Sequence, residues 1–93
     1  MQAITITARN VKFAPGSTTA AAGIEVALTL ANQDVGVLHD LVVFDTSGAL
    51  VARTEVISGP SMASTSFLPA AAGRYAFKCS VHPQTMIGTI TVQ

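Results

Sequence analysis

The chain has 93 residues, of which 49% are hydrophobic and 11% charged, and its five Lys and Arg balance five Asp and Glu. This length predicts a single domain over residues 1–93, because domains usually span about 100–200 residues. The neutral balance argues against a nucleic-acid partner, and the lack of a run of 18 apolar residues argues against a membrane span. The chain has one cysteine, Cys79, so no internal disulfide can stabilise this small domain.

The first third of the chain alternates apolar and polar residues, which predicts half-buried strands separated by turns. Strands are predicted at residues 4–7, 18–22 and 25–31. Turn residues follow the first strand at 13–17, where Pro presets φ and Gly allows positive φ. A polar turn is predicted at 32–34.

The same pattern continues after an apolar loop at 35–38. Residues 39–44 have apolar residues at both odd and even positions, as expected for a strand buried on both faces. Residues 50–57 fit either a strand or a short helical excursion. Further strands are predicted at 64–68, 74–79 and 86–92, with turns or loops at 45–48, 58–61 and 69–73. Seven or eight short strands at spacings of about 8–12 residues predict an all-β fold, either a sandwich or a small barrel.

Three potential metal ligands lie between the last two predicted strands: Cys79, His82 and Met86. Cys79 lies on the same face of its strand as Tyr75 and Phe77, and Met86 lies on the same face as Ile90 and Val92. Both side chains are therefore expected to point toward the core. His39, at the start of an upstream strand, points inward by the same argument. We expect all four side chains to converge at one end of the fold if that strand lies near the last hairpin.

The types of these ligands indicate copper. Thiolate and thioether are soft ligands, and imidazole suits copper. Two His and one Cys in a trigonal arrangement, with a weak axial Met, describe a blue-copper electron-transfer site. A tight loop between two hydrogen-bonded strands would hold such ligands rigidly, so that little moves when an electron is transferred.

The chain resembles the cupredoxins, a family of small copper proteins. The resemblance covers nearly the whole chain, and the loop with Cys79, His82 and Met86 is its most specific part. The other matching segments are Phe13-Ala14-Pro15, Gly23-Ile24-Glu25-Val26, Asn32-Gln33-Asp34, Tyr75-Ala76-Phe77-Lys78 and Gly88-Thr89-Ile90-Thr91-Val92. The resemblance implies a Greek-key β-sandwich with copper at one end. It implies His39, Cys79 and His82 as equatorial ligands and Met86 as the axial ligand.

The sequence departs from the family pattern in two places. Three residues separate His82 from Met86, whereas amicyanin-like loops have two and plastocyanin-like loops four. Gln84 is therefore an alternative axial ligand, since Gln can serve in that position. Asp40 follows His39 where plastocyanin and pseudoazurin carry Asn. This position helps to tie the His strand to the Cys loop in the family, so different local hydrogen bonding is expected.

Other interpretations of these residues fit less well. Cys79 alone would suit a small buried hydrophobic residue. Cys79 with His82 could form a thiol nucleophile, but no orienting third group is evident. A structural zinc site usually has four Cys or His ligands, and a thioether is a poor zinc ligand.

The predicted function is that of a one-electron carrier that cycles Cu(II) and Cu(I) between redox partners, and not that of an enzyme. The resemblance implies that the His82 ring edge lies at the surface and passes electrons. A flat patch of apolar loop residues is expected to dock transient redox partners: Gly36, Val37, Leu38, Pro83 and Ile87. We expect a monomer, and weak electrostatic steering because the net charge is zero.

The alternative function is copper binding and delivery, or a copper-binding module of a larger oxidase or reductase, with the same ligands. The first residues show no signal-peptide pattern, so we expect either a cytoplasmic protein or the mature form of an exported one. A free thiol invites oxidation outside the cytoplasm, and copper would protect it. This favours a periplasmic or extracellular location.

Overall fold

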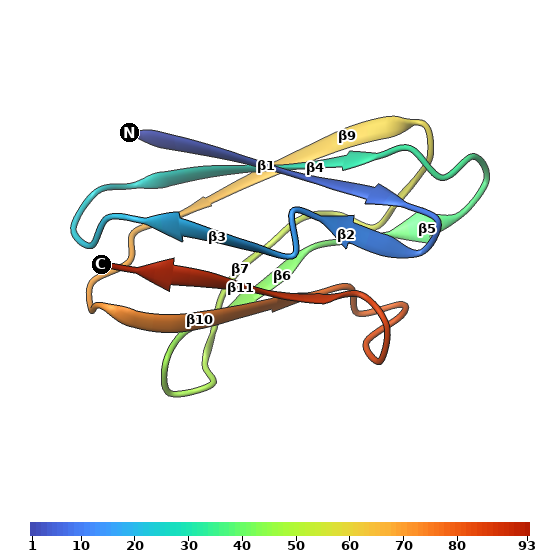
Figure 1. The fold of residues 1–93 in the computed structure, drawn as a ribbon. Helices are drawn as coiled ribbons and strands as arrows, with labels where there is room; N and C mark the ends of the chain where they lie inside the picture. The colour runs from blue at the N-terminus through green and yellow to red at the C-terminus, as the bar shows by residue number, and fades with distance from the viewer.

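The computed structural model describes residues 1–93 and contains β-strands as its only regular elements (Figure 1). The strands in chain order are β1 (Gln2–Arg9), β2 (Lys12–Ala14), β3 (Ser17–Ala20), β4 (Val26–Asn32), β5 (Leu38–His39), β6 (Val42–Phe44), β7 (Leu50–Arg53), β8 (Ile57–Ser58), β9 (Ser61–Phe67), β10 (Gly73–Lys78) and β11 (Ile87–Val92). The structure contains no helix long and apolar enough to cross a membrane.

Two sheets pack face to face as a Greek-key sandwich, which confirms the predicted fold class. One sheet has the order β2-β1-β4-β9 and the other β3-β11-β10-β6-β7, while β5 and β8 form a separate two-stranded ladder. The chain passes repeatedly from one sheet to the other, so that β1 pairs in parallel with β4 and β3 in parallel with β11. The remaining strand pairs are antiparallel.

The core lies between the sheets and follows the alternation of the sequence. Every second residue of β4 is buried from Val26 to Asn32, as expected for a strand with one face on the core. Fully buried side chains come from both inner faces, among them Ile6, Leu28, Leu30, Val43, Phe77 and Ile90. The predicted strand buried on both faces is confirmed at β6, where Val42 and Val43 are both buried within the five-stranded sheet.

The strand count differs from the prediction because several expected segments are divided. The predicted strand 39–44 breaks between β5 and β6, where Leu41 N donates to Thr54 Oγ1 at 3.0 Å and Leu41 O accepts from Thr54 N at 2.9 Å. These bonds take the Leu41 backbone out of the regular ladder. Residues 50–57 form the strand β7 and the start of β8, and not a helix.

Segments predicted as turns also contribute strand residues. The tight turn after β1 lies at Asn10 and Val11, so part of the predicted turn 13–17 belongs to β2. Asn32, predicted in a polar turn, is the buried last residue of β4. Its side-chain amide donates to Val37 O and Ile57 O, at 2.9 and 3.0 Å, so a polar side chain can lie in the core without losing hydrogen bonds.

Candidate metal centre

The four candidate ligands lie at the end of the sandwich opposite the chain termini (Figure 1). His39 ends β5, Cys79 directly follows β10, and Met86 directly precedes β11. Because β10 and β11 are paired up to Lys78 and Ile87, residues 79–86 form the loop at the open end of this hairpin. We call residues 79–86 the ligand loop and this end of the molecule the site end.

Three of the candidate ligands meet at bonding geometry for one metal ion. Cys79 Sγ lies 3.8 Å from His39 Nδ1 and 3.7 Å from His82 Nδ1, and the three donor atoms all lie within 4.8 Å of one another. Bonds of roughly 2.0 Å to nitrogen and 2.3 Å to sulfur, at about 120°, would place N and S roughly 3.7 Å apart. The spacing therefore fits a trigonal site.

The candidate ligands differ in burial, so that one side of the site faces the core and the other faces the surface. Cys79, His39 and Met86 are all 0% exposed, whereas His82 is half-buried. The two imidazole rings lie edge to face, with centroids 5.0 Å apart. Only His82 therefore connects the buried donor atoms to the surface.

The ligand loop is held by its own backbone. Cys79 N donates to Met86 O at 3.0 Å, which closes the loop at its base. Met86 N donates in turn to His82 O at 3.1 Å. All three loop ligands are thus linked through main-chain bonds that involve no metal.

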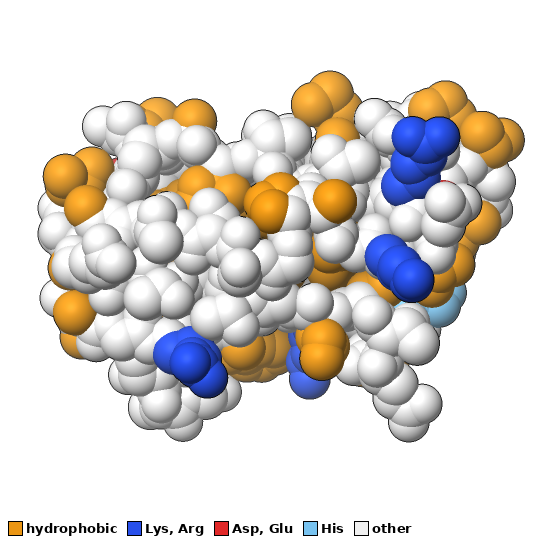
Figure 2. Space-filling view, viewed as in Figure 1, with side chains coloured by type: hydrophobic (Ala, Val, Ile, Leu, Met, Phe, Trp, Pro, Cys, Tyr) orange, Lys and Arg blue, Asp and Glu red, His pale blue; other side chains and the backbone are white.

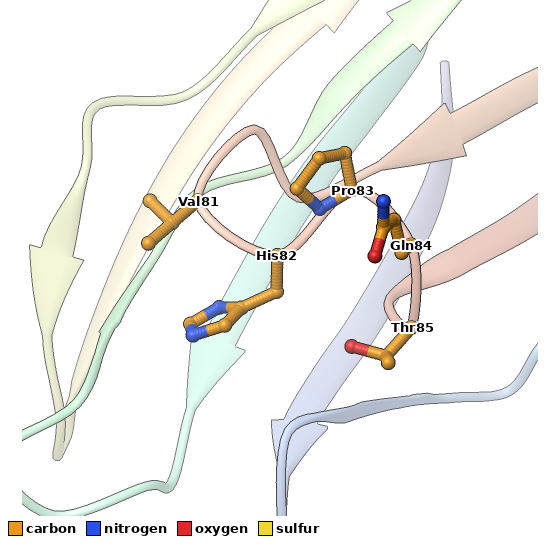
Figure 3. Close-up of a pocket in the computed structure, with 5 residues that line it drawn as sticks. All are labelled: Val81, His82, Pro83, Gln84 and Thr85. Atoms are coloured by element: carbon orange, nitrogen blue, oxygen red, sulfur yellow. The ribbon is translucent and has the colours of Figure 1, made fainter.

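Burial also separates the two axial candidates. Met86 is fully buried in the core cluster, whereas Gln84 is exposed. Gln84 lines a shallow surface hollow with Val81, His82, Pro83 and Thr85, and its side chain lies away from the His82 ring (Figure 3). This arrangement favours Met86 as the axial ligand.

Asp40 ties the His39 strand to the ligand loop. Its carboxylate accepts a hydrogen bond from Ser80 N at 2.7 Å and another from the Ser80 hydroxyl at 2.6 Å. The Arg53 guanidinium lies 4.0 Å away at the edge of this buried group. Asp40 therefore links the two segments as the family pattern implied for Asn, with both carboxylate oxygens accepting from one serine.

A second carboxylate, which sequence reasoning missed, contacts a ligand directly. His39 Nε2 donates to Asp34 Oδ2 at 2.7 Å. A carboxylate only accepts hydrogen bonds, so the proton lies on Nε2 and Nδ1 keeps a free lone pair toward Cys79. Asp34 also accepts from Asn10 N and Val11 N, at 2.6 and 2.9 Å.

These bonds stabilise the charged form of Asp34. They hold its pKa below the ordinary value, first through the Val11 N–H and next through the His39 ring. The sequence carried no periodic signal for this role, because the Asn10–Val11 turn that completes the site for Asp34 lies 23–24 residues upstream.

The comparisons with known proteins agree with this site. A family model described as a cupredoxin-like domain matches residues 1–92. The chain belongs to the cupredoxin family. No curated protein sequence matches this cupredoxin.

Solved structures resemble this cupredoxin over its full length. Auracyanin A, a "blue" copper protein from the green thermophilic photosynthetic bacterium Chloroflexus aurantiacus, aligns with a TM-score of 0.87 at 18% identity, covering 98% of each chain. Reduced auracyanin from Roseiflexus castenholzii aligns at 0.89 and 18%, covering 100% of this chain and 98% of the other. Auracyanin B aligns at 0.84 and 26%, covering 99% and 88%.

The donor set of this cupredoxin, two His, one Cys and one Met in this arrangement, is that of a single type 1 copper site. Its separations fit one ion, its thiol is buried, and its imidazoles present Nδ1 to the centre. The residues therefore fit the metal that the family carries.

Proposed function

We propose that this cupredoxin binds one copper ion through His39, Cys79, His82 and Met86 and carries single electrons between other proteins. The observation that carries the proposal is the preformed triangle of Nδ1, Sγ and Nδ1 atoms, all within 4.8 Å. Bound copper would supply the Cu(II)/Cu(I) couple. In this role the protein makes and breaks no covalent bond in its partners and is not an enzyme.

Each residue has a distinct role in the proposal. Cys79, fully buried, provides the thiolate, and His39 holds the inner side of the site. His82 is half-buried at the surface and provides the route for electrons. Met86 provides the weak axial bond, which tunes the potential. The main-chain bonds of the ligand loop keep these groups in place during oxidation and reduction.

The predicted docking patch around His82 is supported by exposed apolar side chains. Leu38 is 51% exposed and Ile87 60%, while Pro83 and Gly36 are exposed and Val37 is half-buried. Val35 and Val81 extend the exposed apolar surface. A patch of this small kind fits a transient redox encounter, which buries little area.

Charges around the patch indicate what its partner carries. Arg9 and Lys12 pair across the β1–β2 turn at the site end, and both are exposed. Lys or Arg side chains are visible at this end, beside a His side chain (Figure 2). The carboxylates of Asp34 and Asp40 lie inside and are hydrogen-bonded. We therefore propose partners that present carboxylates around an apolar centre.

The remaining charged residues complete this asymmetry. Arg53 and Lys78 both pair with Val42 in the five-stranded sheet, close to the site end. Glu25 and Asp45 lie at the opposite end, since they precede β4 and follow β6. Glu55 is the one exposed acidic residue near the site end. The zero net charge of the chain thus does not describe the docking surface.

Copper reconstitution tests the proposal. Adding Cu(II) to the purified metal-free protein should give an intense visible thiolate-to-copper band, and Cys79→Ser should abolish it. Gln84→Ala is the matched control in the same loop and should keep the band. A colourless copper adduct of the wild-type protein, or a band that survives Cys79→Ser, would refute the proposed function.

A second measurement separates the electron carrier from a copper-delivery protein. A carrier should keep its copper through repeated cycles of oxidation and reduction in the presence of a Cu(I) chelator, whereas a delivery protein should release it. We further propose that residues 1–93 act as one monomeric domain in the periplasm or outside the cell. The lone thiol, Cys79, is buried, and bound copper would protect it from oxidation, which supports this location.

A further inference from the structure

The carboxylate of Asp34 joins a candidate copper ligand to a surface turn. Its Oδ2 lies 2.7 Å from His39 Nε2, and its oxygens also accept from Asn10 N and Val11 N. The Asp34 side chain is 10% exposed and His39 is 0% exposed. The contact is therefore shielded from water at the inner side of the site.

We propose that Asp34 is the positioning residue of His39, and that it sets how strongly the site prefers Cu(II) to Cu(I). This inference rests on the proposed function. A carboxylate that accepts the Nε2 proton fixes the ring tautomer and makes Nδ1 a stronger donor. A stronger nitrogen donor favours Cu(II) over Cu(I), since Cu(I) prefers sulfur. The Asp34 carboxylate therefore lowers the reduction potential.

The β1–β2 turn holds Asp34 independently of the metal. Asn10 and Val11 have φ values of 54° and 56°, a conformation that is rare for a β-branched residue such as Val11. Two successive N–H groups in such a turn form a concave site for an anion. The Asp34 carboxylate occupies that site and so stabilises the unusual turn.

Asp34 is also held from its own side of the chain. Its backbone N–H donates to Asn32 Oδ1 at 2.9 Å, and its carbonyl accepts from Val37 N at 3.1 Å. A Cβ on Gly59 would overlap the Asp34 carbonyl oxygen, so the backbone at Gly59 packs directly against Asp34. The carboxylate thus reaches His39 from a fixed position.

The variant Asp34→Asn tests the inference. An amide oxygen in place of Oδ2 can still accept from His39 Nε2 and Val11 N, but the NH2 group in place of Oδ1 would face the Asn10 N–H donor, and the negative charge is lost. Mutation of such a supporting group typically weakens metal affinity about 10–100-fold. If the loss falls on Cu(II), voltammetry should show a higher potential, by about 59 mV for each tenfold change in the affinity ratio.

Asp40→Asn is the matched control, because it removes the other buried carboxylate at the site without touching His39 Nε2. Asp40→Asn removes a negative charge and alters the Ser80 bonds but leaves the His39 Nε2 bond in place, so Asp34→Asn should raise the potential more. Equal shifts in the two variants, or no shift in Asp34→Asn, would overturn the inference.

A second measurement needs no copper and can be made on the wild-type protein, so it does not depend on whether the variant folds. In ¹⁵N NMR of the metal-free wild-type protein, His39 should be the Nε2–H tautomer with a slowly exchanging proton. The same proton should exchange faster in Asp34→Asn. A wild-type His39 protonated on Nδ1, or one with a rapidly exchanging Nε2 proton, would refute the role of Asp34, whereas a failure of the proposed function would appear as a missing blue band.

Discussion

At the scale of single residues, burial decides which side chain can complete the copper site. Met86 is fully buried in the core cluster that also contains Cys79, whereas Gln84 is exposed in the hollow of the ligand loop. A weak axial ligand tunes the potential without carrying the colour of the site. The two residues can therefore be separated by their effects on potential.

Met86→Gln should lower the reduction potential while the protein stays coloured. A Gln oxygen is a harder ligand than a thioether and so favours Cu(II). Voltammetry and the visible spectrum of the copper-loaded variant check this prediction. Gln84→Ala should leave both unchanged. A higher potential in Gln84→Ala, with no shift in Met86→Gln, would assign the axial position to Gln84 instead.

Gly88 is a second residue on which the site end depends. It pairs with Phe77 across the β10–β11 hairpin, just after the ligand loop. A Cβ here would overlap the Phe77 ring and lie 2.6 Å from Gly16 O, which accepts a hydrogen bond from Thr89 N. Only glycine fits between the ring and this backbone oxygen.

Gly88→Ala should destabilise the fold by about 1–3 kcal/mol, the usual cost of overpacking a core. Denaturant unfolding of the metal-free protein measures the free energy. Gly16→Ala is the control, because a Cβ at Gly16 would meet nothing within 4 Å; it should change the free energy by less than about 0.5 kcal/mol. A stable Gly88→Ala would mean that Phe77 repacks.

At the scale of elements, the length of a strand decides whether the sequence reveals it. The strands β1, β4, β10 and β11 have six to eight residues, long enough for their alternation to predict them. The strands β5 and β8 have two residues each, too few to show a period. Long-range pairing between Leu38 and Ser58 and between His39 and Ile57 forms them.

The same reason limits prediction of the site. His39, Cys79 and Met86 were assigned to the core from alternation, and all three are buried. The Ser80 bonds of Asp40 and the Asn10 and Val11 bonds of Asp34 connect segments that only the fold brings together. The sequence therefore predicts the ligands more completely than the groups that orient them.

The β6–β7 turn gives a prediction about pH. Asp45 Oδ1 accepts from the Ser47 hydroxyl, Ser47 N and Ala49 N, at 2.7, 2.9 and 3.0 Å. These bonds favour the carboxylate and lower its pKa, the Ser47 hydroxyl first. Asp45 therefore stabilises the folded state above the unfolded pKa of about 3.9, and this contribution disappears as pH falls through the lower folded pKa.

An NMR titration of the Asp45 carboxyl carbon checks this prediction. Its midpoint should lie below the ordinary value for Asp, and Ser47→Ala should raise it. The midpoint should rise because Ser47→Ala removes the hydroxyl bond, which lowers the pKa most, while the bonds from Ser47 N and Ala49 N remain. An unchanged midpoint in Ser47→Ala would assign the low pKa to the backbone alone.

At the scale of the whole molecule, the candidate ligands bridge two separate parts of the fold. His39 belongs to the small β5–β8 ladder, whereas the other three ligands lie on the β10–β11 hairpin of the five-stranded sheet. A metal that binds only the folded chain would stabilise this bridge. It would replace the disulfide that a chain with one cysteine lacks.

Copper should therefore raise the melting temperature. At free copper of about 100 times the dissociation constant, the stabilisation should reach about 2.7 kcal/mol. Calorimetry of the metal-free and copper-loaded protein measures it, and Cys79→Ser should lose most of the increase. Equal melting temperatures with and without bound copper would show that copper binding does not stabilise the fold.

The uneven surface charge gives the last prediction, because four of the five basic residues lie at or near the site end. Reduced protein should transfer an electron faster to an anionic complex such as hexacyanoferrate(III) at low salt, and more slowly as salt screens charges beyond about 10 Å at 0.1 M. Stopped-flow rates against ionic strength measure this slope. Neutralising Arg9 and Lys12 to Gln should flatten it, whereas Arg74→Gln, at the opposite end of β10, should not. A slope that responds only to Arg74→Gln would place the electron route away from His82.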